Sequence, residues 1–303
     1  MISRNIKIYN QLFDLINTFE SSTVAREVIQ AAIGLKPSRL ILTETNTNAI
    51  IEILRNYKIP YFVLDTPIYC LVHGKETTWS NRILLNKEIN KFPKKNVQKN
   101  WCIYLDMKKQ FKELKECDFG KDDNQMAFYL GIPECCSKFY SKYAREALLY
   151  DLDFLPFCFD NTNFNQIGWC NILSQYLGHC LFSHFPCSFE CEKTRELSKN
   201  TYDLLKQIEI KQHKDFKACH FNSYLYSVNT KIVTPISISK KEDQRWIGIE
   251  DKIYSKIDST DRKDIEQYNI KYLRRSLCSV KRVSKIKKEN FEISYIFNPG
   301  MDI

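Results

Sequence analysis

Apolar residues recur every three to four positions through residues 5 to 34, which is the spacing of amphipathic helices. A short apolar run at 39 to 43 then predicts a strand. Helical spacing returns at 45 to 58 after a capping Thr or Asn, and a second strand is expected at 61 to 65. With a hairpin around Gly74, these elements predict a small α/β unit at the start of the chain.

The pattern changes twice further along the chain. A lysine-rich connection at 90 to 100 is followed by helical spacing that reaches residue 210, and the remainder is rich in strand-forming residues. The pattern therefore predicts a mixed α/β or α+β fold in three parts. These are a small α/β domain at 1–100, a helical metal-binding domain at 101–215 and a β-rich basic region at 216–303.

Two adjacent cysteines begin one of the predicted helices. In GIPECCSKFY, residues 131 to 140, Pro133 suits the first helical position, and Cys135 and Cys136 follow in the first turn. Unpaired N–H groups and the positive end of the helix dipole favour thiolate there. Because neighbouring side chains diverge by about 100° around a helix, we expect Cys136 to be the weaker metal ligand of the two.

The segment SHFPCSFECEKT, residues 183 to 194, repeats this arrangement. Pro186 is predicted to start a helix, so that Cys187 and Cys191 project from one face one turn apart. His184 comes just before that start and is a further candidate ligand. The preceding residues, 168 to 185, are predicted to form a core helix.

Four thiolates suit either tetrahedral zinc or an iron–sulfur cluster. Neither segment has the spacing of a zinc finger or a ferredoxin. The candidate ligands come from scattered segments of a large helical region, which favours an iron–sulfur cluster, in particular 4Fe–4S, with zinc as the alternative. A further alternative is that these cysteines are small buried hydrophobic residues.

The two motifs, G-x-P-x-C-C and H-x-P-C-S-x-x-C-E, resemble an uncharacterised prokaryotic cysteine-rich family known as domain of unknown function 483. The resemblance extends to GLKPSRLI at residues 34 to 41 and covers about residues 30 to 205. It implies a metal or cluster site and supplies no reaction. The matching residues are Gly131, Pro133, Cys135, Cys136, His184, Pro186, Cys187, Ser188, Cys191 and Glu192.

Charge favours an anionic partner, because 45 Lys+Arg against 36 Asp+Glu give the 303 residues a net charge of +9. The partner would be an anionic small molecule or a nucleic acid. The strongest basic segment, residues 271 to 288, could instead be an edge strand whose lysines prevent pairing with other chains. The candidate phosphate-binding or nucleic-acid-binding residues in it are Arg274, Arg275, Lys281 and Arg282.

No stretch is apolar for long enough to span a bilayer, and the N-terminus has the pattern of an amphipathic helix rather than a signal peptide. Twelve cysteines are best kept as thiols in a reducing compartment. We therefore expect a cytoplasmic protein with no membrane association.

The leading hypothesis is an enzyme that uses a cysteine-bound iron–sulfur centre for redox, sulfur or group-transfer chemistry on an anionic substrate. Its candidate substrate-binding residues are Asn171, Glu192 and Arg82. One alternative is a non-catalytic, zinc-stabilised module that binds RNA or another partner through its basic C-terminal region. Another is a metal-free thiol enzyme with Cys135 or Cys187 as its nucleophile.

Overall fold

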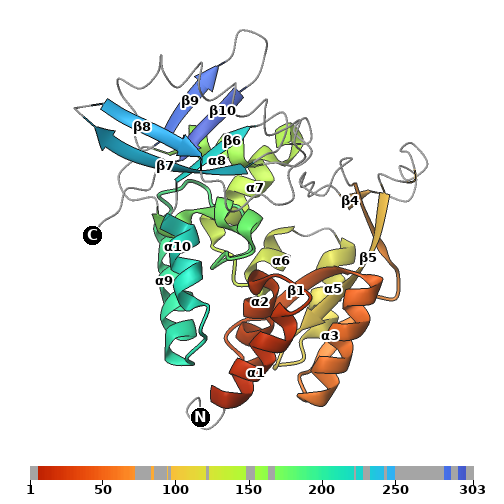
Figure 1. Ribbon diagram of the computed structural model, residues 1–303. Coiled ribbons are helices and arrows are strands. Elements are labelled where there is room, and N and C mark those ends of the chain that lie inside the picture. Colours follow the sequence, from red (N-terminus) through yellow and green to blue (C-terminus); the bar gives the residue numbers. More distant parts are fainter. Residues whose placement is uncertain are drawn as a thin grey trace.

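The protein is described by a computed structural model, which contains helices and two antiparallel sheets (Figure 1). This arrangement confirms the mixed α+β class predicted from the sequence. The structure describes residues 6–71, 83–84, 94, 97–120, 123–147, 154–162, 168–221, 223–227, 233–241, 244–249, 283–287 and 293–297.

The first sheet is built around one long strand, β5 (Val97–Leu105). It pairs with β1 (Ser38–Thr43), β2 (Tyr61–Val63) and β3 (Ile68–Leu71), and β3 pairs in turn with β4 (Ile83–Leu84). Every one of these pairings is antiparallel. The domain boundary predicted at residue 100 falls inside β5, so this strand completes the sheet of the N-terminal unit.

The side chains of β5 alternate between two apolar layers, as the period of a strand requires. Ile103 and Leu105 belong to the main core, whereas Cys102 and Tyr104 belong to a smaller core on the opposite face. All four side chains are fully buried. The sheet is therefore covered by helices on both faces.

Helices from the start of the chain cover the main-core face. They contribute residues such as Phe13 and Ile50 to the same cluster as Ile103. The smaller core is closed by residues such as Leu114. The main-core helices are α1 (Ile6–Asn17), α2 (Ser22–Ala32) and α3 (Glu44–Asn56), and those on the other face are α5 (Phe111–Gly120) and α6 (Asp123–Tyr129).

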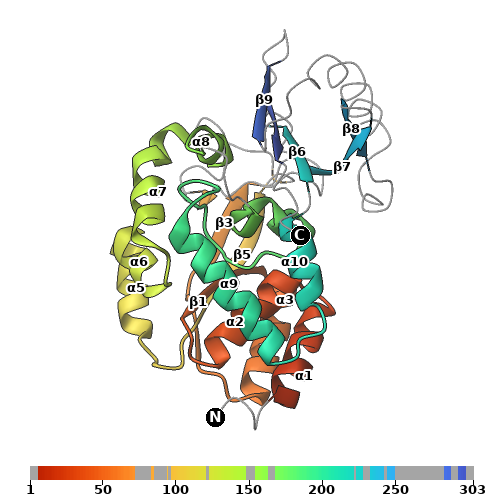
Figure 2. The same ribbon diagram turned by 90° about the vertical axis from the view of Figure 1, so that its left-hand side faces the viewer.

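The main core continues from this sheet into the helical centre, since one cluster runs from Leu12 to Phe216. Figure 2 shows α9 crossing beside α2, and the Gln30 amide of α2 donates to the Thr201 hydroxyl of α9 at 2.9 Å. The helices of this centre are α7 (Glu134–Ala147), α8 (Leu155–Asp160), α9 (Glu192–Gln207) and α10 (His213–Phe221).

The core helix predicted at residues 168 to 185 does not form. Two short 3₁₀ helices, η4 (Gly168–Cys170) and η5 (Ile172–Leu177), take its place. The second ends at Gly178, whose φ of 75° suits glycine. Beyond it, the Cys180 N–H donates to the Thr23 hydroxyl at 2.8 Å, so the backbone bonds to α2 instead of continuing a helix.

The second sheet confirms that the C-terminal part is rich in strands. Its order is β8-β7-β6-β10-β9, and neighbouring strands are antiparallel throughout. The strands are β6 (Ser223–Ser227), β7 (Val233–Lys241), β8 (Gln244–Ile249), β9 (Val283–Lys287) and β10 (Ile293–Phe297). Among the helices that the structure describes, none has both the length and the apolar composition needed to cross a membrane.

Candidate metal centre

The first cysteine pair lies where the sequence predicts, in the first turn of α7. The helix begins at Glu134, directly after Pro133, whose carbonyl accepts a hydrogen bond from the N–H of Cys136 at 2.9 Å. Gly131 precedes it with a φ of 69°, a conformation in which glycine carries no steric cost. Local sequence is therefore sufficient to place Cys135 and Cys136 at a helix N-terminus.

The second cysteine pair is not carried by a helix that starts at Pro186, so that prediction is wrong. Instead α9 begins one residue after Cys191, and the preceding residues form turns. The Phe189 ring is buried against Phe159 of α8, with ring centroids 4.8 Å apart, and the Phe189 N–H donates to the Thr162 hydroxyl at 3.0 Å. These contacts hold the backbone in a turn.

The four cysteine sulfurs nevertheless come together. The Sγ atoms of Cys135, Cys136, Cys187 and Cys191 all lie within 4.8 Å of one another. The Cys191 sulfur is 3.6 Å from the Cys135 sulfur and 3.6 Å from the Cys136 sulfur. The sulfurs of Cys135 and Cys136 are 3.9 Å apart. Both adjacent cysteines reach the group, although we expected Cys136 to be the weaker ligand.

This spacing fits one metal ion with four thiolate ligands. Tetrahedral bonds of about 2.3 Å to a central zinc place the sulfurs about 3.8 Å apart. The three short separations bracket this value, at 3.6, 3.6 and 3.9 Å. Cys136 and Cys191 are buried, Cys187 is half-buried and Cys135 is exposed, so the centre lies at the edge of the core.

The thiols perturb one another strongly. Hydrogen bonds from Cys136 and Cys187 hold the pKa of Cys191 well below its usual range. A hydrogen bond with Cys136 lowers the pKa of Cys187, but the hydrogen bond with Cys191 and burial outweigh it and raise that pKa to about 12. Four thiolates in this space repel one another, so a bound cation is what allows all of them to ionise.

His184 does not belong to the group of four sulfurs. Its Nε2 lies 3.0 Å from the Thr194 hydroxyl, and that hydroxyl lies 3.4 Å from the Cys136 sulfur. Burial lowers the pKa of His184 to about 3, so the ring is neutral near pH 7. Cys170 is also adjacent, but its sulfur bonds to the Cys191 carbonyl at 3.2 Å. His184 and Cys170 therefore lie beside the centre without joining the group of four sulfurs.

Two of the candidate substrate-binding residues, Asn171 and Glu192, fall within the described residues. Asn171 is fully buried, and its amide donates to the His220 carbonyl at 2.9 Å and accepts from the Leu173 N–H at 3.1 Å. Glu192 is exposed and lies 3.7 Å from Arg195. A substrate role for these residues stays a prediction. Five further candidates fall outside the described residues, namely Arg82, Arg274, Arg275, Lys281 and Arg282.

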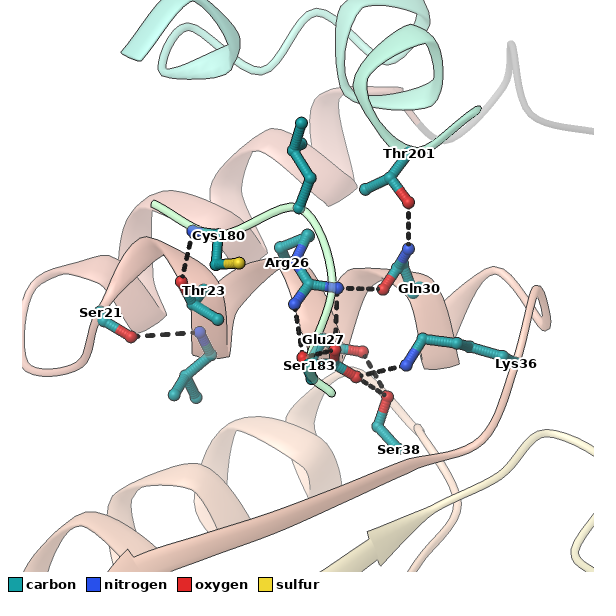
Figure 3. Close-up of polar contacts among 12 residues, drawn as sticks. Ser21, Thr23, Arg26, Glu27, Gln30, Lys36, Ser38, Cys180, Ser183 and Thr201 are labelled. Atoms are coloured by element: carbon teal, nitrogen blue, oxygen red, sulfur yellow. Dashed lines mark hydrogen bonds and ion pairs between the residues drawn. The ribbon is translucent and has the colours of Figure 1, made fainter. Parts of the chain in front are cut away.

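A buried cluster of charged residues is not anticipated by the sequence. Glu27 of α2 is 2.8 Å from both Arg26 and Lys36, and it also accepts hydrogen bonds from Ser38 and Ser183 (Figure 3). Although burial raises the pKa of Glu27, the charges of Arg26 and Lys36 hold it well below its usual range. In the sequence, Arg26 and Glu27 resemble the polar face of an amphipathic helix, and no local signal marks them as buried.

Comparisons of this chain with protein-family models, with curated proteins and with solved structures find no match.

Proposed function

We propose that Cys135, Cys136, Cys187 and Cys191 bind one zinc ion in a closed four-thiolate site. The observation that carries this proposal is the spacing of the sulfurs, all within 4.8 Å of one another. Sites with four cysteine ligands and no open position are typical of structural zinc. The ion would fasten the start of α7 to the turn that precedes α9.

The spacing favours a single ion over the iron–sulfur cluster that leads among the sequence-based hypotheses. In a four-iron cluster each thiolate binds a different iron, so the whole cluster separates the cysteine sulfurs. The sulfurs of Cys135 and Cys136 are each 3.6 Å from that of Cys191, which is closer than this arrangement requires and supports the proposal of a single ion. Zinc, with tetrahedral preference and affinity for thiolate, suits the donor set best.

The ion would stabilise the fold because it joins cysteines that are far apart in the chain. Cys135 and Cys191 are 56 positions apart, and the segment between them holds short helices and turns instead of one continuous element. A zinc ion contributes its binding free energy directly to folding when the site exists only in the folded chain. The protein is then a zinc-stabilised module. Because thiolate ligands persist in reducing compartments, a cytoplasmic location is part of this proposal.

The metal-free thiol enzyme is less well supported. Burial and the neighbouring Cys191 raise the pKa of Cys135, and the pKa of Cys187 is raised to about 12. A thiol nucleophile needs a lowered pKa instead. The resemblance to domain of unknown function 483 agrees with a metal site at these residues, and membership of that family remains part of this proposal.

Iron in the same site is the second candidate, because Cys135 is exposed and one side of the centre can be reached from solvent. A redox role on an anionic substrate would require iron in this site. Binding of RNA or another partner through the basic C-terminal region also stays a proposal, since residues 271–282 lie outside the described residues.

Chelation tests the zinc-stabilised module. Treating the purified protein with a zinc chelator is expected to lower its melting temperature, and adding zinc is expected to restore it. Cys191→Ser should show neither response. Cys70→Ser, which changes a cysteine of β3 away from the centre, should respond as the wild type does. A melting temperature that chelation leaves unchanged would contradict the proposal.

A further inference from the structure

A cavity with an excess of positive charge lies beside the metal centre. Its volume is about 50 Å³. At about 10–15 Å³ for each water molecule, this is room for roughly four. The cavity therefore has the bulk of one carboxylate or phosphoryl group and is too small for a nucleotide.

The lining of the cavity carries three cationic side chains against one carboxylate. Arg26, Lys36 and Arg39 all line it, and Glu27 is the only acidic residue among the lining residues. The Arg26 side chain is fully buried, and the side chains of Lys36 and Glu27 are 14% and 8% exposed. One carboxylate faces both Arg26 and Lys36, so the cluster carries a net positive charge when Lys36 is protonated. Burial and the charge of Arg26 lower the pKa of Lys36, and the charge of Glu27 opposes this shift.

The hydrogen bonds of Arg26 leave one of its nitrogens without a partner among the described residues. Its Nη1 donates to the Gln30 amide oxygen at 2.6 Å and pairs with Glu27, and its Nη2 donates to Ser183 at 2.7 Å (Figure 3). Its Nε is buried and has no hydrogen-bond partner among the residues that the structure describes. A buried donor without a partner costs about 1–3 kcal/mol, so the described residues satisfy the charge of Arg26 only in part.

The cavity adjoins the cysteines through two of its lining residues. Ile132, which precedes α7, also packs against the cluster of Cys136, Cys170 and Cys191. His184 reaches the Cys136 sulfur through the Thr194 hydroxyl, at 3.0 and 3.4 Å. Anything bound in the cavity therefore lies one layer of side chains from the metal centre.

We propose that this cavity binds a small oxyanion, a free anion or the carboxylate or phosphoryl end of a larger ligand. Lys36 and Arg39 supply charge at the surface of the cavity, and the buried guanidinium of Arg26 adds positive charge behind that surface. The adjacency to a metal ion rests on the proposed function, whereas the cavity itself does not. The same position suits a ligand whose binding stabilises the segments that carry the cysteines.

Calorimetric titration of the full chain with inorganic phosphate and with acetate, at constant ionic strength, tests this proposal. Wild-type protein is expected to bind at least one of them with a Kd of about 1 mM or tighter. Arg39→Gln should weaken binding at least about tenfold, because it removes a charge-assisted contact. The matched control is Arg55→Gln, since Arg55 donates to the Tyr61 hydroxyl as Arg39 donates to that of Tyr104.

Lys36→Met provides a second variant that keeps one cation beside Glu27, and it should also weaken binding. Absence of binding to both anions by wild-type protein, or equal binding by Arg39→Gln and wild type, would overturn the cavity proposal. Zinc content measured on the same samples separates the two claims. Protein that holds zinc without binding either anion contradicts only the cavity, and protein that binds an anion without zinc contradicts only the metal centre.

Discussion

The sulfur of Cys136, in the first turn of α7, lies 3.6 Å from the sulfur of Cys191, the residue before α9, although 55 positions separate them in the chain. This contact brings two helix N-termini to one point. The positive ends of both helix dipoles then favour thiolate at the same place, which is the condition for binding a metal cation by cysteine.

Removing one ligand should abolish stoichiometric metal binding. Cys191→Ser is expected to lower zinc affinity more than about 100-fold, because even outer partners of a ligand are worth about 10–100-fold. Cys102→Ala is the matched control, since Cys102 is buried in the smaller core of the first sheet and contributes no sulfur to the group. It should keep one zinc per chain in a competition assay with a chromophoric chelator. Loss of zinc in both variants would contradict the assignment of the four ligands.

The turn that carries Cys187 and Cys191 should depend on Phe189. Phe189→Ala is expected to lower the free energy of unfolding by about 3–5 kcal/mol, the usual cost of removing a buried phenyl ring. Phe128 is 78% exposed on α6, so Phe128→Ala should change the free energy of unfolding by no more than about 0.5 kcal/mol. Urea unfolding with zinc present measures both. Similar stability in the two variants would be evidence against the buried turn.

Removing the buried carboxylate of Glu27 should strongly lower the free energy of unfolding. Glu27→Gln leaves Arg26 and Lys36 buried together, and we expect a loss of about 3–5 kcal/mol. Glu116→Gln is the control, because Glu116 forms only an exposed pair with Lys112 at 3.9 Å and should cost less than about 1 kcal/mol. A small effect of Glu27→Gln in urea unfolding would show that the cluster is hydrated.

Stability should fall as the solution becomes acidic, partly because of His220. Burial lowers the pKa of His220 to about 3, whereas an unfolded chain has a His pKa of about 6.5. The unfolded state binds the proton first, so this contribution is complete above about pH 6.5 and is lost as the pH falls toward about 3. Each unit of difference between the folded and unfolded pKa corresponds to about 1.4 kcal/mol in the free energy of unfolding.

His220→Gln should flatten part of that pH dependence while keeping an acceptor for the Leu181 N–H, which donates to His220 Nε2 at 3.0 Å. Urea unfolding at about pH 7 and about pH 4.5 measures the difference. A variant whose stability falls as steeply as that of the wild type would argue against a buried neutral ring at this position.

The start of α7 is predictable because its signals are local. Pro133 and the acidic Glu134 mark the helix N-terminus within a few residues of Cys135, and the structure has the helix there. The start of α9 is not predictable in this way. The contact that keeps the chain from entering the helix at Pro186 is made by Phe189 with a residue of α8, 30 positions earlier.

Tertiary contacts also explain why the charged cluster was missed. Arg26 and Glu27 are charged residues of a kind that is usually exposed, and their partner Ser183 is more than 150 positions away. Likewise, the apolar residues at 168 to 185 suit a core helix by composition, but their backbone groups bond to α2 and α10. Local propensity identifies the apolar residues, and long-range hydrogen bonds decide their conformation.

The central claim is that one zinc ion occupies the four-cysteine centre. Elemental analysis together with a visible absorption spectrum, on protein purified without oxygen, tests it most directly. A zinc centre gives one zinc per chain and a colourless protein. Iron with inorganic sulfide and a brown colour would contradict it in favour of a cluster, and protein without any bound metal would contradict the metal centre itself.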